Sequence, residues 1–375
     1  MRKVAVAGVG MCKFGRYEDR DLDDLGHEAV VNALKDADYE WLDVQAIFCA
    51  NAYGGMGVGH RVAYSIGMKG VPIVNVENAC SGGMSAFRLC YQSVASGLYD
   101  VCLAIGVEKI PGGLLDDSSW PIFERRMGFN VQPASYGVEA QRHMEEYGST
   151  VEQFAKVTVK NRRNGCLNPY AGFQKEVTVE EVLNSRMISY PLRLLMCCAN
   201  GDGAAAAVLC SSNKLKSKRK KVTVAATALT SETYGNVKGA GSIRIHNLDR
   251  TEIGAKQAYE ISGYGPEDID VLEAYDTMAS AELINVEKLG FCKKGEYGHL
   301  LEEGAFDRDG KLPINPSGGL LSRRHPVSAT GLAQIAELVW QLKEEAGARQ
   351  IAGARVGMAH CLGAPGNSAI TILKT

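Results

Sequence analysis

The sequence predicts an α/β fold made of two similar halves, and three observations support this. Short apolar runs alternate with amphipathic stretches along most of the 375 residues, as expected for strands joined by crossover helices. The same order of segments recurs in the second half of the chain. The composition, 46% hydrophobic and 22% charged with 42 glycines, is that of a globular protein and not of a fibrous or disordered one.

The expected elements follow one another in a regular order. In the first half we expect strands at 4–10, 46–50, 72–78, 100–107 and 203–210, with helices through 27–37 and 81–98. In the second half we expect strands at 222–230, 268–276, 354–361 and 368–375, with helices at 251–262, 279–290 and 329–346.

Two segments interrupt this order. Residues 118–185 are richer in charged and aromatic residues and are predicted to form an inserted, mainly helical domain. The basic run KLKSKRKK favours a solvated linker, placed at 213–220, over an anion-binding patch. The N-terminal half therefore comprises 1–117 and 186–212, and the C-terminal half comprises 221–375.

The two halves resemble each other segment by segment. DVQAIFCAN matches DIDVLEAYD, NACSGGMSAF matches RRHPVSATGL, and DVCLAIGVEK matches ARVGMAHCLG. If the halves are duplicated units, Cys80 and His325 occupy the same place in each, a loop that leads into a helix of small residues. Two such loops facing each other across a pseudo-twofold axis would form one site.

Composition also excludes several functions. A net charge of -2 and a pI near 6.4 provide no field that attracts nucleic acid. No apolar run reaches the roughly 20 residues of a membrane-spanning helix, and the short N-terminal apolar run lacks a signal-peptide cleavage site. The eleven scattered cysteines show no paired zinc-binding spacing and suit a reducing compartment. We therefore expect a cytoplasmic protein with no metal, no membrane contact and no nucleic-acid partner.

Cys80 is the candidate nucleophile. The strand-like PIVNVEN leads directly into Ala79 and Cys80, and two glycines and an amphipathic helix follow. A cysteine at a helix N-terminus faces unpaired backbone N–H groups and the positive end of the helix dipole, which favour the reactive thiolate. A packed, unreactive cysteine is the alternative for any single cysteine in this sequence.

Several motifs together resemble the thiolase superfamily. NACSGGMSAF is similar to the nucleophile loop of thiolases, and GDGAAAAVL, INPSGG, HPVSATGLAQ and HCLGAPG resemble other segments of that superfamily in the expected order. The resemblance covers nearly the whole chain. It implies the thiolase fold, with two βαβαβαββ halves in five layers (αβαβα). It also implies that coenzyme A is the co-substrate and that Cys80 accepts the acyl group.

The resemblance also assigns roles to further residues. His325 matches the histidine of the family's GHP motif, which activates the nucleophile, although Arg324 replaces the usual glycine. Cys361 matches the cysteine of the CxG motif, which acts as acid and base toward the substrate α-carbon. Gly363 matches the residue whose backbone N–H, with that of Cys80, would form the oxyanion hole.

The segment INPSGGLL is the candidate contact with coenzyme A. Glycines without a Cβ would let the backbone at Ser317, Gly318 and Gly319 approach the pantetheine arm closely. A plain turn is the alternative interpretation of this segment.

Tyr275 departs from the family pattern. Thiolases have asparagine or histidine at that place, whereas this chain has Tyr275 followed by Asp276. The phenol could donate to the thioester oxygen, or it could transfer a proton in a carbon–carbon cleavage like that of the thiolase-like aldolases. A retro-aldolase using Tyr275 and Asp276 is thus one alternative function, and a packing tyrosine is the structural alternative.

The resemblance extends to a subgroup and its partners. NPYA and PLRLL are similar to sterol-carrier-type and archaeal thiolases, some of which work with a small zinc-ribbon and OB-fold partner. Some act on aromatic substrates such as benzoylsuccinyl-CoA. We expect a homodimer that cleaves a 3-oxoacyl-CoA or runs the reverse Claisen condensation. The remaining alternatives are a ketoacyl synthase and a non-catalytic acyl-CoA or lipid carrier on the same scaffold.

Overall fold

The computed structural model describes residues 1–113, 122–128, 131–232, 249–364 and 366–375. Its main feature is a nine-stranded sheet in the order β3-β2-β4-β7-β1-β8-β11-β10-β9. The strands are β1 (Val4–Met11), β2 (Ala46–Ala50), β3 (Ile73–Val76), β4 (Val101–Glu108), β7 (Gly203–Ser211), β8 (Val222–Ser231), β9 (Val271–Glu273), β10 (Val356–Gly363) and β11 (Asn367–Lys374).

The sheet consists of two half-sheets with matching topology, which confirms the predicted duplication. In the first, β2 runs parallel to β3 and β4, and β7 is antiparallel to both β4 and β1. In the second, β10 runs parallel to β9, and β11 is antiparallel to both β10 and β8. A parallel bridge between Leu272 and Ile314 occupies the place of the β2–β3 pairing. The half-sheets meet where Ala5 pairs with Thr223 and Val6 with Val222.

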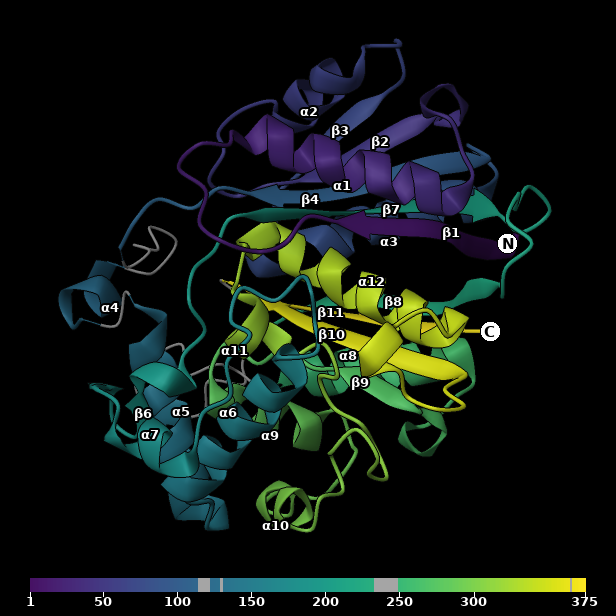
Figure 1. The fold of residues 1–375 in the computed structure, drawn as a ribbon. Helices are drawn as coiled ribbons and strands as arrows, with labels where there is room; N and C mark the ends of the chain where they lie inside the picture. Colours follow the sequence, from purple (N-terminus) through teal and green to yellow (C-terminus); the bar gives the residue numbers. More distant parts are fainter. Residues whose placement is uncertain (114–121, 129–130, 233–248, 365) are drawn as a thin grey trace.

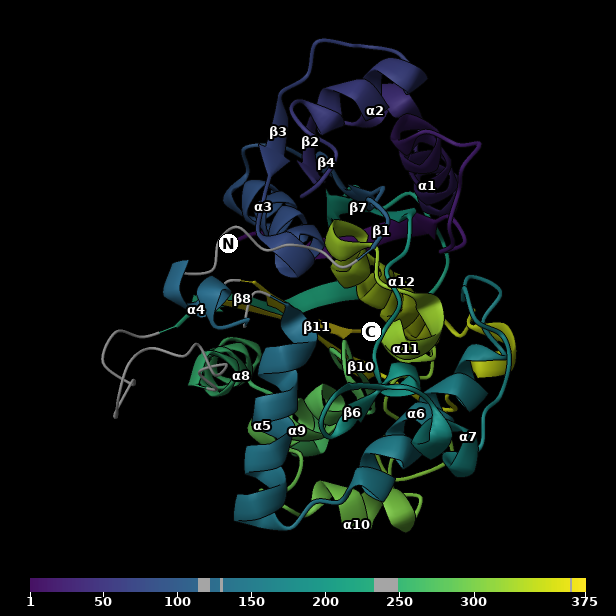
Figure 2. The same ribbon diagram turned by 90° about the vertical axis from the view of Figure 1, so that its left-hand side faces the viewer.

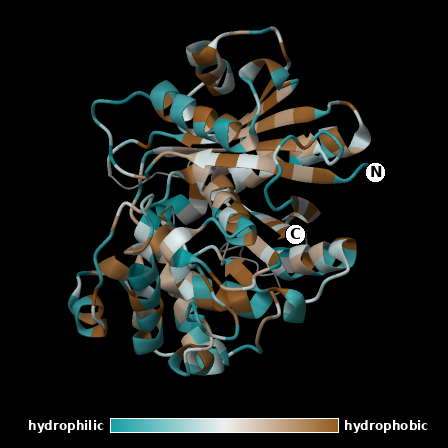
Figure 3. Ribbon diagram, turned by 45° about the vertical axis from the view of Figure 1, so that its right-hand side comes forward, coloured by the Kyte–Doolittle hydropathy of each residue, from teal (hydrophilic) through white to brown (hydrophobic). Residues whose placement is uncertain are grey.

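Helices complete the predicted five layers (Figure 1). The helices α1 (Leu22–Ala37) and α2 (Val58–Ile66) cover the outer face of the first half-sheet, while α8 (Asp249–Ser262) and α9 (Ala279–Lys288) lie outside the second. The helices α3 (Gly82–Ser96) and α12 (Thr330–Lys343) lie between the half-sheets and contact each other. Because helices cover both faces, β1, β4 and β7 are buried along their whole length. Figure 3 shows these strands as mainly apolar, with hydrophilic residues on the outer helices.

The inserted segment lies beside the second half (Figure 2). It contains α4 (Ile122–Arg126), α5 (Gln132–Tyr147), α6 (Val151–Gly165) and α7 (Val179–Asn184), followed by the hairpin of β5 (Met187–Ser189) and β6 (Leu192–Arg193). Both α5 and α6 contact α9, and α6 also contacts α10 (Tyr297–Glu302) and α11 (Gly319–Arg323). In the described part of the chain, no helix has the length and apolar character that a membrane span requires.

The basic segment between β7 and β8 contacts both halves. Lys216 pairs with Asp43 at 2.6 Å in the first half. Lys220 pairs with Glu344 at 2.9 Å just after α12. These surface pairs are exposed and each contributes little stability, and the linker role of residues 213–220 stays a prediction.

The N-terminal ends of α3 and α12 approach so closely that neither tolerates a larger residue. A Cβ at Gly83 would lie 2.5 Å from the carbonyl oxygen of Ser328, and a Cβ at Gly331 would lie 2.7 Å from Met84 Cγ. A Cβ at Gly106 on β4 would lie 2.3 Å from the same Ser328 oxygen. Real Cβ atoms do not approach this closely, so the glycines determine the separation of the two central helices.

Gly83→Ala tests this packing. Alanine favours a helix over glycine by about 1 kcal/mol, yet the added methyl group meets backbone atoms that cannot move freely. We expect a net loss of about 1 to 3 kcal/mol in the free energy of unfolding, measured by urea denaturation. Gly82→Ala is the matched control, because its Cβ would meet only side-chain atoms, the nearest at 3.2 Å. Equal stability of the two variants would contradict the packing argument.

Candidate active site

The loop that carries Cys80 is a strained turn between β3 and α3. A 3-10 turn, Ala79–Ser81, places Cys80 immediately before α3, as the sequence predicted. Ala79 has a φ of 45°, which a residue with a side chain seldom adopts. The Ser81 hydroxyl donates to the Asn78 carbonyl at 2.9 Å, and the Asn78 amide donates to Ser85 at 2.9 Å. These bonds hold Cys80 in place with a side chain only 2% exposed.

His325 reaches Cys80 from the other half of the molecule. It lies just before the 3-10 turn Val327–Ala329 that leads into α12. Its Nε2 is 3.1 Å from the Cys80 sulfur, and its Nδ1 is 2.7 Å from the Thr330 hydroxyl oxygen. The predicted convergence of Cys80 and His325 on one site is therefore seen in the structure.

Thr330 determines which nitrogen of His325 carries the proton. Its hydroxyl donates to the Pro326 carbonyl at 3.2 Å. A hydroxyl has one hydrogen, so its oxygen accepts the Nδ1–H of His325. The Nε2 atom is then unprotonated and can accept the Cys80 proton. The sequence analysis missed Thr330; a hydroxyl residue five positions after a histidine, in a turn that starts a helix, was the available signal.

The resting pair is a neutral thiol and a neutral imidazole. Burial raises the pKa of Cys80 to about 11, although the Tyr275 hydroxyl and the backbone amides of Cys80 and Ala364 favour the anion. Burial, reinforced by the nearby Arg323 charge, lowers the pKa of His325 to about 3. The backbone amides at the helix start favour a thiolate at Cys80, as expected, but desolvation outweighs them and keeps the thiol protonated at rest.

Tyr275 belongs to the same cluster. It follows β9, its hydroxyl is 3.4 Å from His325 Nε2, and the two rings meet edge to face with centroids 5.8 Å apart. Burial raises its pKa well above the usual value, and the neighbouring Cys80 adds to this effect. Tyr275 is therefore a neutral phenol with its hydroxyl beside the sulfur, which differs from a tyrosine whose hydroxyl is bonded elsewhere.

Cys361 approaches from the end of β10. Its thiol donates to the backbone oxygen of Cys80 at 3.0 Å. Burial raises its pKa well above the usual value, and the neighbouring Cys80 adds to this effect, so Cys361 also rests as a neutral thiol.

The backbone amides beside the Cys80 sulfur are its own and that of Ala364, the residue after Gly363. The oxyanion role of the Gly363 amide stays a prediction. Gly363 itself is the last residue of β10, paired with Asn367. A Cβ at Gly363 would lie 2.4 Å from the Ser81 hydroxyl and 2.5 Å from the Asn78 carbonyl oxygen. Its lack of a side chain thus lets β10 touch the nucleophile loop.

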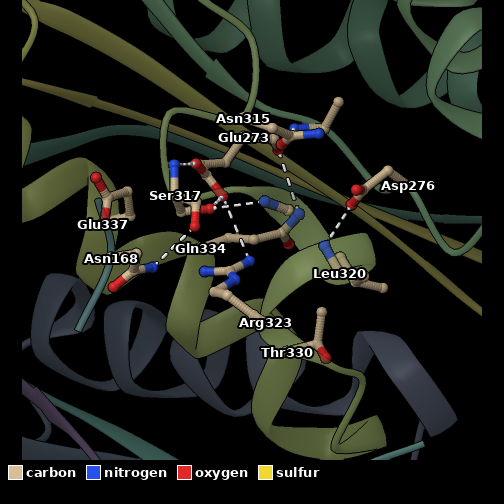
Figure 4. A network of polar contacts seen from close by, with 12 residues as sticks. Asn168, Glu273, Asp276, Asn315, Ser317, Leu320, Arg323, Thr330, Gln334 and Glu337 are labelled. Atoms are coloured by element: carbon tan, nitrogen blue, oxygen red, sulfur yellow. Dashed lines mark hydrogen bonds and ion pairs between the residues drawn. The ribbon is translucent and has the colours of Figure 1, made fainter. Parts of the chain in front are cut away.

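Asp276 accepts hydrogen bonds that hold neighbouring segments of the protein together (Figure 4). It is fully buried, and its carboxylate accepts the backbone N–H groups of Leu320 at 2.7 Å and Leu321 at 3.2 Å. The Asn161 amide donates to it at 2.8 Å. Its oxygens are therefore engaged in holding α11 against α6.

The segment predicted to contact coenzyme A, residues 317–319, is buried beside Asp276. The Ser317 hydroxyl donates to Glu273 at 2.7 Å, and Arg323 pairs with that carboxylate at 3.3 Å (Figure 4). A Cβ at Gly318 would lie 2.5 Å from Gly165, and one at Gly319 would lie 2.1 Å from Asp276. These glycines permit close packing within the protein, and contact of Ser317, Gly318 and Gly319 with coenzyme A stays a prediction.

Comparisons with known proteins agree with this arrangement. The family model described as "Thiolase, N-terminal domain" matches residues 4–213, and the family model described as "Thiolase C-terminal domain-like" matches residues 244–375. The chain is 40% identical over 385 residues to "Acetyl-CoA acetyltransferase" of Methanothermobacter thermautotrophicus, covering 98% of each. It is 41% identical over 371 residues to "Benzoylsuccinyl-CoA thiolase subunit BbsB" of Thauera aromatica, covering 96% of this chain and 95% of that one.

A solved structure shows the same fold. The "Ltp2-ChsH2(DUF35) aldolase" superposes with a TM-score of 0.87 at 25% identity, over 100% of this chain and 98% of that one. The duplicated α/β halves and these similar proteins place the chain among acyltransferases. The chain belongs to the thiolase family.

Family membership confirms the predicted fold and the predicted class of enzyme, an acyltransferase. Thiolases use coenzyme A as co-substrate. Among the residues that the structure describes, no group of three or more His, Cys, Asp or Glu side chains is arranged to hold a metal ion.

The pH dependence of Cys80 alkylation tests the resting protonation state. Since the pKa of Cys80 is about 11, iodoacetamide labelling should keep rising well above pH 8.5, where a free cysteine is half ionised. Mass spectrometry of the Cys80 peptide, compared with a free-thiol reference, measures this profile. A plateau already reached at neutral pH would show a resting thiolate and contradict the assignment.

Replacing Thr330 tests the tautomer of His325. Thr330→Val keeps the shape but removes the acceptor of the Nδ1 proton, so the ring can place its proton on Nε2 and no longer accept one from Cys80. We expect Cys80 labelling at neutral pH to slow by about a hundredfold, with Thr330→Ser close to the native rate. Unfolding midpoints of both variants separate this effect from lost stability. Similar rates for the valine and serine variants would refute the role of the hydroxyl.

Proposed function

We propose that this chain is a coenzyme A-dependent thiolase that cleaves a 3-oxoacyl-CoA, or runs the reverse Claisen condensation, through an acyl-enzyme on Cys80. The observation that carries the proposal is the 3.1 Å contact between the Cys80 sulfur and the unprotonated nitrogen of His325. A buried thiol beside a buried base can become a nucleophile during the reaction without a standing charge.

The first half-reaction uses all three groups. The Cys80 sulfur attacks the 3-oxo carbon while His325 Nε2 takes the thiol proton. The bond between C2 and C3 then breaks, and its electron pair passes to C2, which takes a proton from the Cys361 thiol. An acyl-CoA shortened at this bond leaves, and the remaining acyl group stays on Cys80 as a thioester.

The second half-reaction restores the enzyme. The thiol of coenzyme A gives its proton to the Cys361 thiolate, and its sulfur attacks the acyl carbon on Cys80. The Cys80 sulfur leaves and recovers its proton from His325. Backbone amides at Cys80 and in the Gly363–Ala364 turn are candidates to stabilise the oxyanion, a contribution worth about a hundredfold or more in rate.

Tyr275 supports a second candidate, the retro-aldol cleavage. Its hydroxyl lies beside the reactive sulfur and His325, and the similar solved structure is titled an aldolase. Asp276, however, already accepts two backbone N–H groups and one amide. Tyr275 is thus the group that would carry proton transfer in this alternative. The thiolase reaction is favoured, because an aldolase does not need an acyl-accepting thiol.

The substrate and assembly follow from the relatives. We propose an aromatic or branched 3-oxoacyl-CoA, such as benzoylsuccinyl-CoA, because the relative of that name is 41% identical. That relative is named a subunit and the solved structure joins two names, which supports a partner subunit. We propose that this partner is the small zinc-ribbon and OB-fold protein that the family resemblance implies. The edge strand β3 is partly exposed, with Val74 at 43%, and is the proposed homodimer contact.

All eleven cysteines are free, which suits the cytoplasm.

Trapping the acyl-enzyme tests the function. Short, branched and aromatic 3-oxoacyl-CoA compounds are incubated with the protein, with and without the partner subunit, and mass spectrometry locates the adduct. We expect acylation at Cys80, and a loss of turnover of about a thousandfold or more in Cys80→Ser. Cys166→Ser, at a partly exposed cysteine, is the matched control.

The same variants separate the candidates. A retro-aldolase would keep its turnover in Cys80→Ser and lose it in Tyr275→Phe, with no adduct on the protein. A carrier would bind the acyl-CoA compounds without turnover in any variant. Either pattern would overturn the thiolase assignment.

A further inference from the structure

Two arginines flank one phenylalanine on the outer side of the loop that carries His325. Phe173 lies in the segment between α6 and α7, Arg162 is near the end of α6, and Arg324 directly precedes His325. Each guanidinium carbon is 4.3 Å from the centroid of the Phe173 ring. Both contacts are cation–π interactions, so one ring serves as a platform for two positive charges.

Neither arginine forms an ion pair with a carboxylate in the described part of the chain. Arg162 is only 8% exposed, and the Nε atoms of Arg162 and Arg324 are both buried without an acceptor. Arg324 has one polar contact, from Nη1 to the Asn200 carbonyl at 3.2 Å. Nearby Arg16 is already paired with Asp202 at 3.3 Å, so this pair adds no net charge. Within the described residues, neither positive charge of the cluster is therefore neutralised by a carboxylate.

The surrounding backbone is shaped around the Arg324 side chain. Its φ of 78° and ψ of 176° fall in a region that is essentially limited to glycine. A Cβ at Gly172 or at Gly201 would lie 2.8 Å from atoms of the Arg324 side chain. The backbone of Arg324 is therefore held in a strained conformation between two glycines, and such strain is characteristic of functional sites.

The two charges also disfavour each other. Burial lowers the pKa of Arg162, and Arg324 lowers it further. Burial lowers the pKa of Arg324, and Arg16 adds to this while Asp202 opposes it. A bound anion would relieve both the repulsion and the missing hydrogen bonds.

We propose that Arg162 and Arg324, stacked on Phe173, form a binding site for a phosphate dianion. The charge of about -2 on a phosphate monoester matches the two guanidinium groups, whereas one carboxylate would neutralise only half of it. Guanidinium groups present paired N–H donors that suit phosphate oxygens. The site does not use Cys80, so its tests do not depend on turnover in the proposed thiolase reaction.

Calorimetric titration with inorganic phosphate, at constant ionic strength set with chloride, tests the site. We expect saturable binding to the full chain, weakened about tenfold or more in Arg162→Gln because a charge-assisted contact is lost. Arg163→Gln is the matched control. It removes the same charge from the next residue of α6, whose side chain is 49% exposed and paired with Asp307 at the surface, and it should bind phosphate like the native protein.

Arg324→Gly gives an independent check. Glycine relieves the backbone strain, so the unliganded variant should unfold at the native temperature or above it, yet phosphate should no longer raise that temperature. A purely structural role for the arginines would give the reverse, with lower stability and an unchanged phosphate response. Absence of phosphate binding to the native chain, equal binding to Arg162→Gln, or equally tight binding of succinate would each overturn the proposal.

The source of the phosphate group is a separate comparison. Coenzyme A and dephospho-coenzyme A differ only in the 3′-phosphate. If Arg162→Gln weakens binding of the first and not the second, the site takes that phosphate. If it affects only inorganic phosphate, the site takes the free ion. Both outcomes support a phosphate site and distinguish its ligand, and neither depends on turnover at Cys80.

Discussion

Contact between the starts of two helices, one from each half of the molecule, is the constraint on which the site depends. Cys80 precedes α3 and His325 precedes α12, so the distance between the sulfur and the imidazole is determined by how closely these helices begin. Gly83, Gly331 and Gly106 lack the Cβ atoms that would separate them. The half-sheets on either side then bury the pair and exclude water from it, which makes a 3.1 Å contact stable and electrostatically strong.

Burial of this kind favours neutral groups. The thiols of Cys80 and Cys361 and the imidazole of His325 all rest uncharged. The free-energy cost of desolvating a charge at each group exceeds the stabilisation that nearby hydrogen-bond donors give to that charge. A thiolate and an imidazolium therefore form only when Cys80 passes its proton to His325. The same burial explains why Asp276 and Glu273 are fully engaged by backbone and side-chain donors, since a buried carboxylate without partners would be expensive.

The fold was largely readable from the sequence, because alternating segments and their repetition are properties of the chain itself. The pairing of Cys80 with His325 followed from that repetition and from the family resemblance. Other features depend on contacts between distant segments. Thr330 orients the His325 ring across a turn, and the backbone amide of Ala364 lies beside the Cys80 sulfur. Gly318 packs against Gly165, and Gly319 packs against Asp276. The protonation of Cys80 depends on how much surrounding protein excludes water, which no local motif reveals.

The matching topology of the halves has a further consequence. The strand order in one half repeats in the other, but the equivalent loops carry a cysteine in one and a histidine in the other. Equivalent positions thus hold different chemical groups, a thiol in one loop and an imidazole in the other, and the pair forms only where the two loops meet. Neither half on its own can therefore assemble the reactive pair.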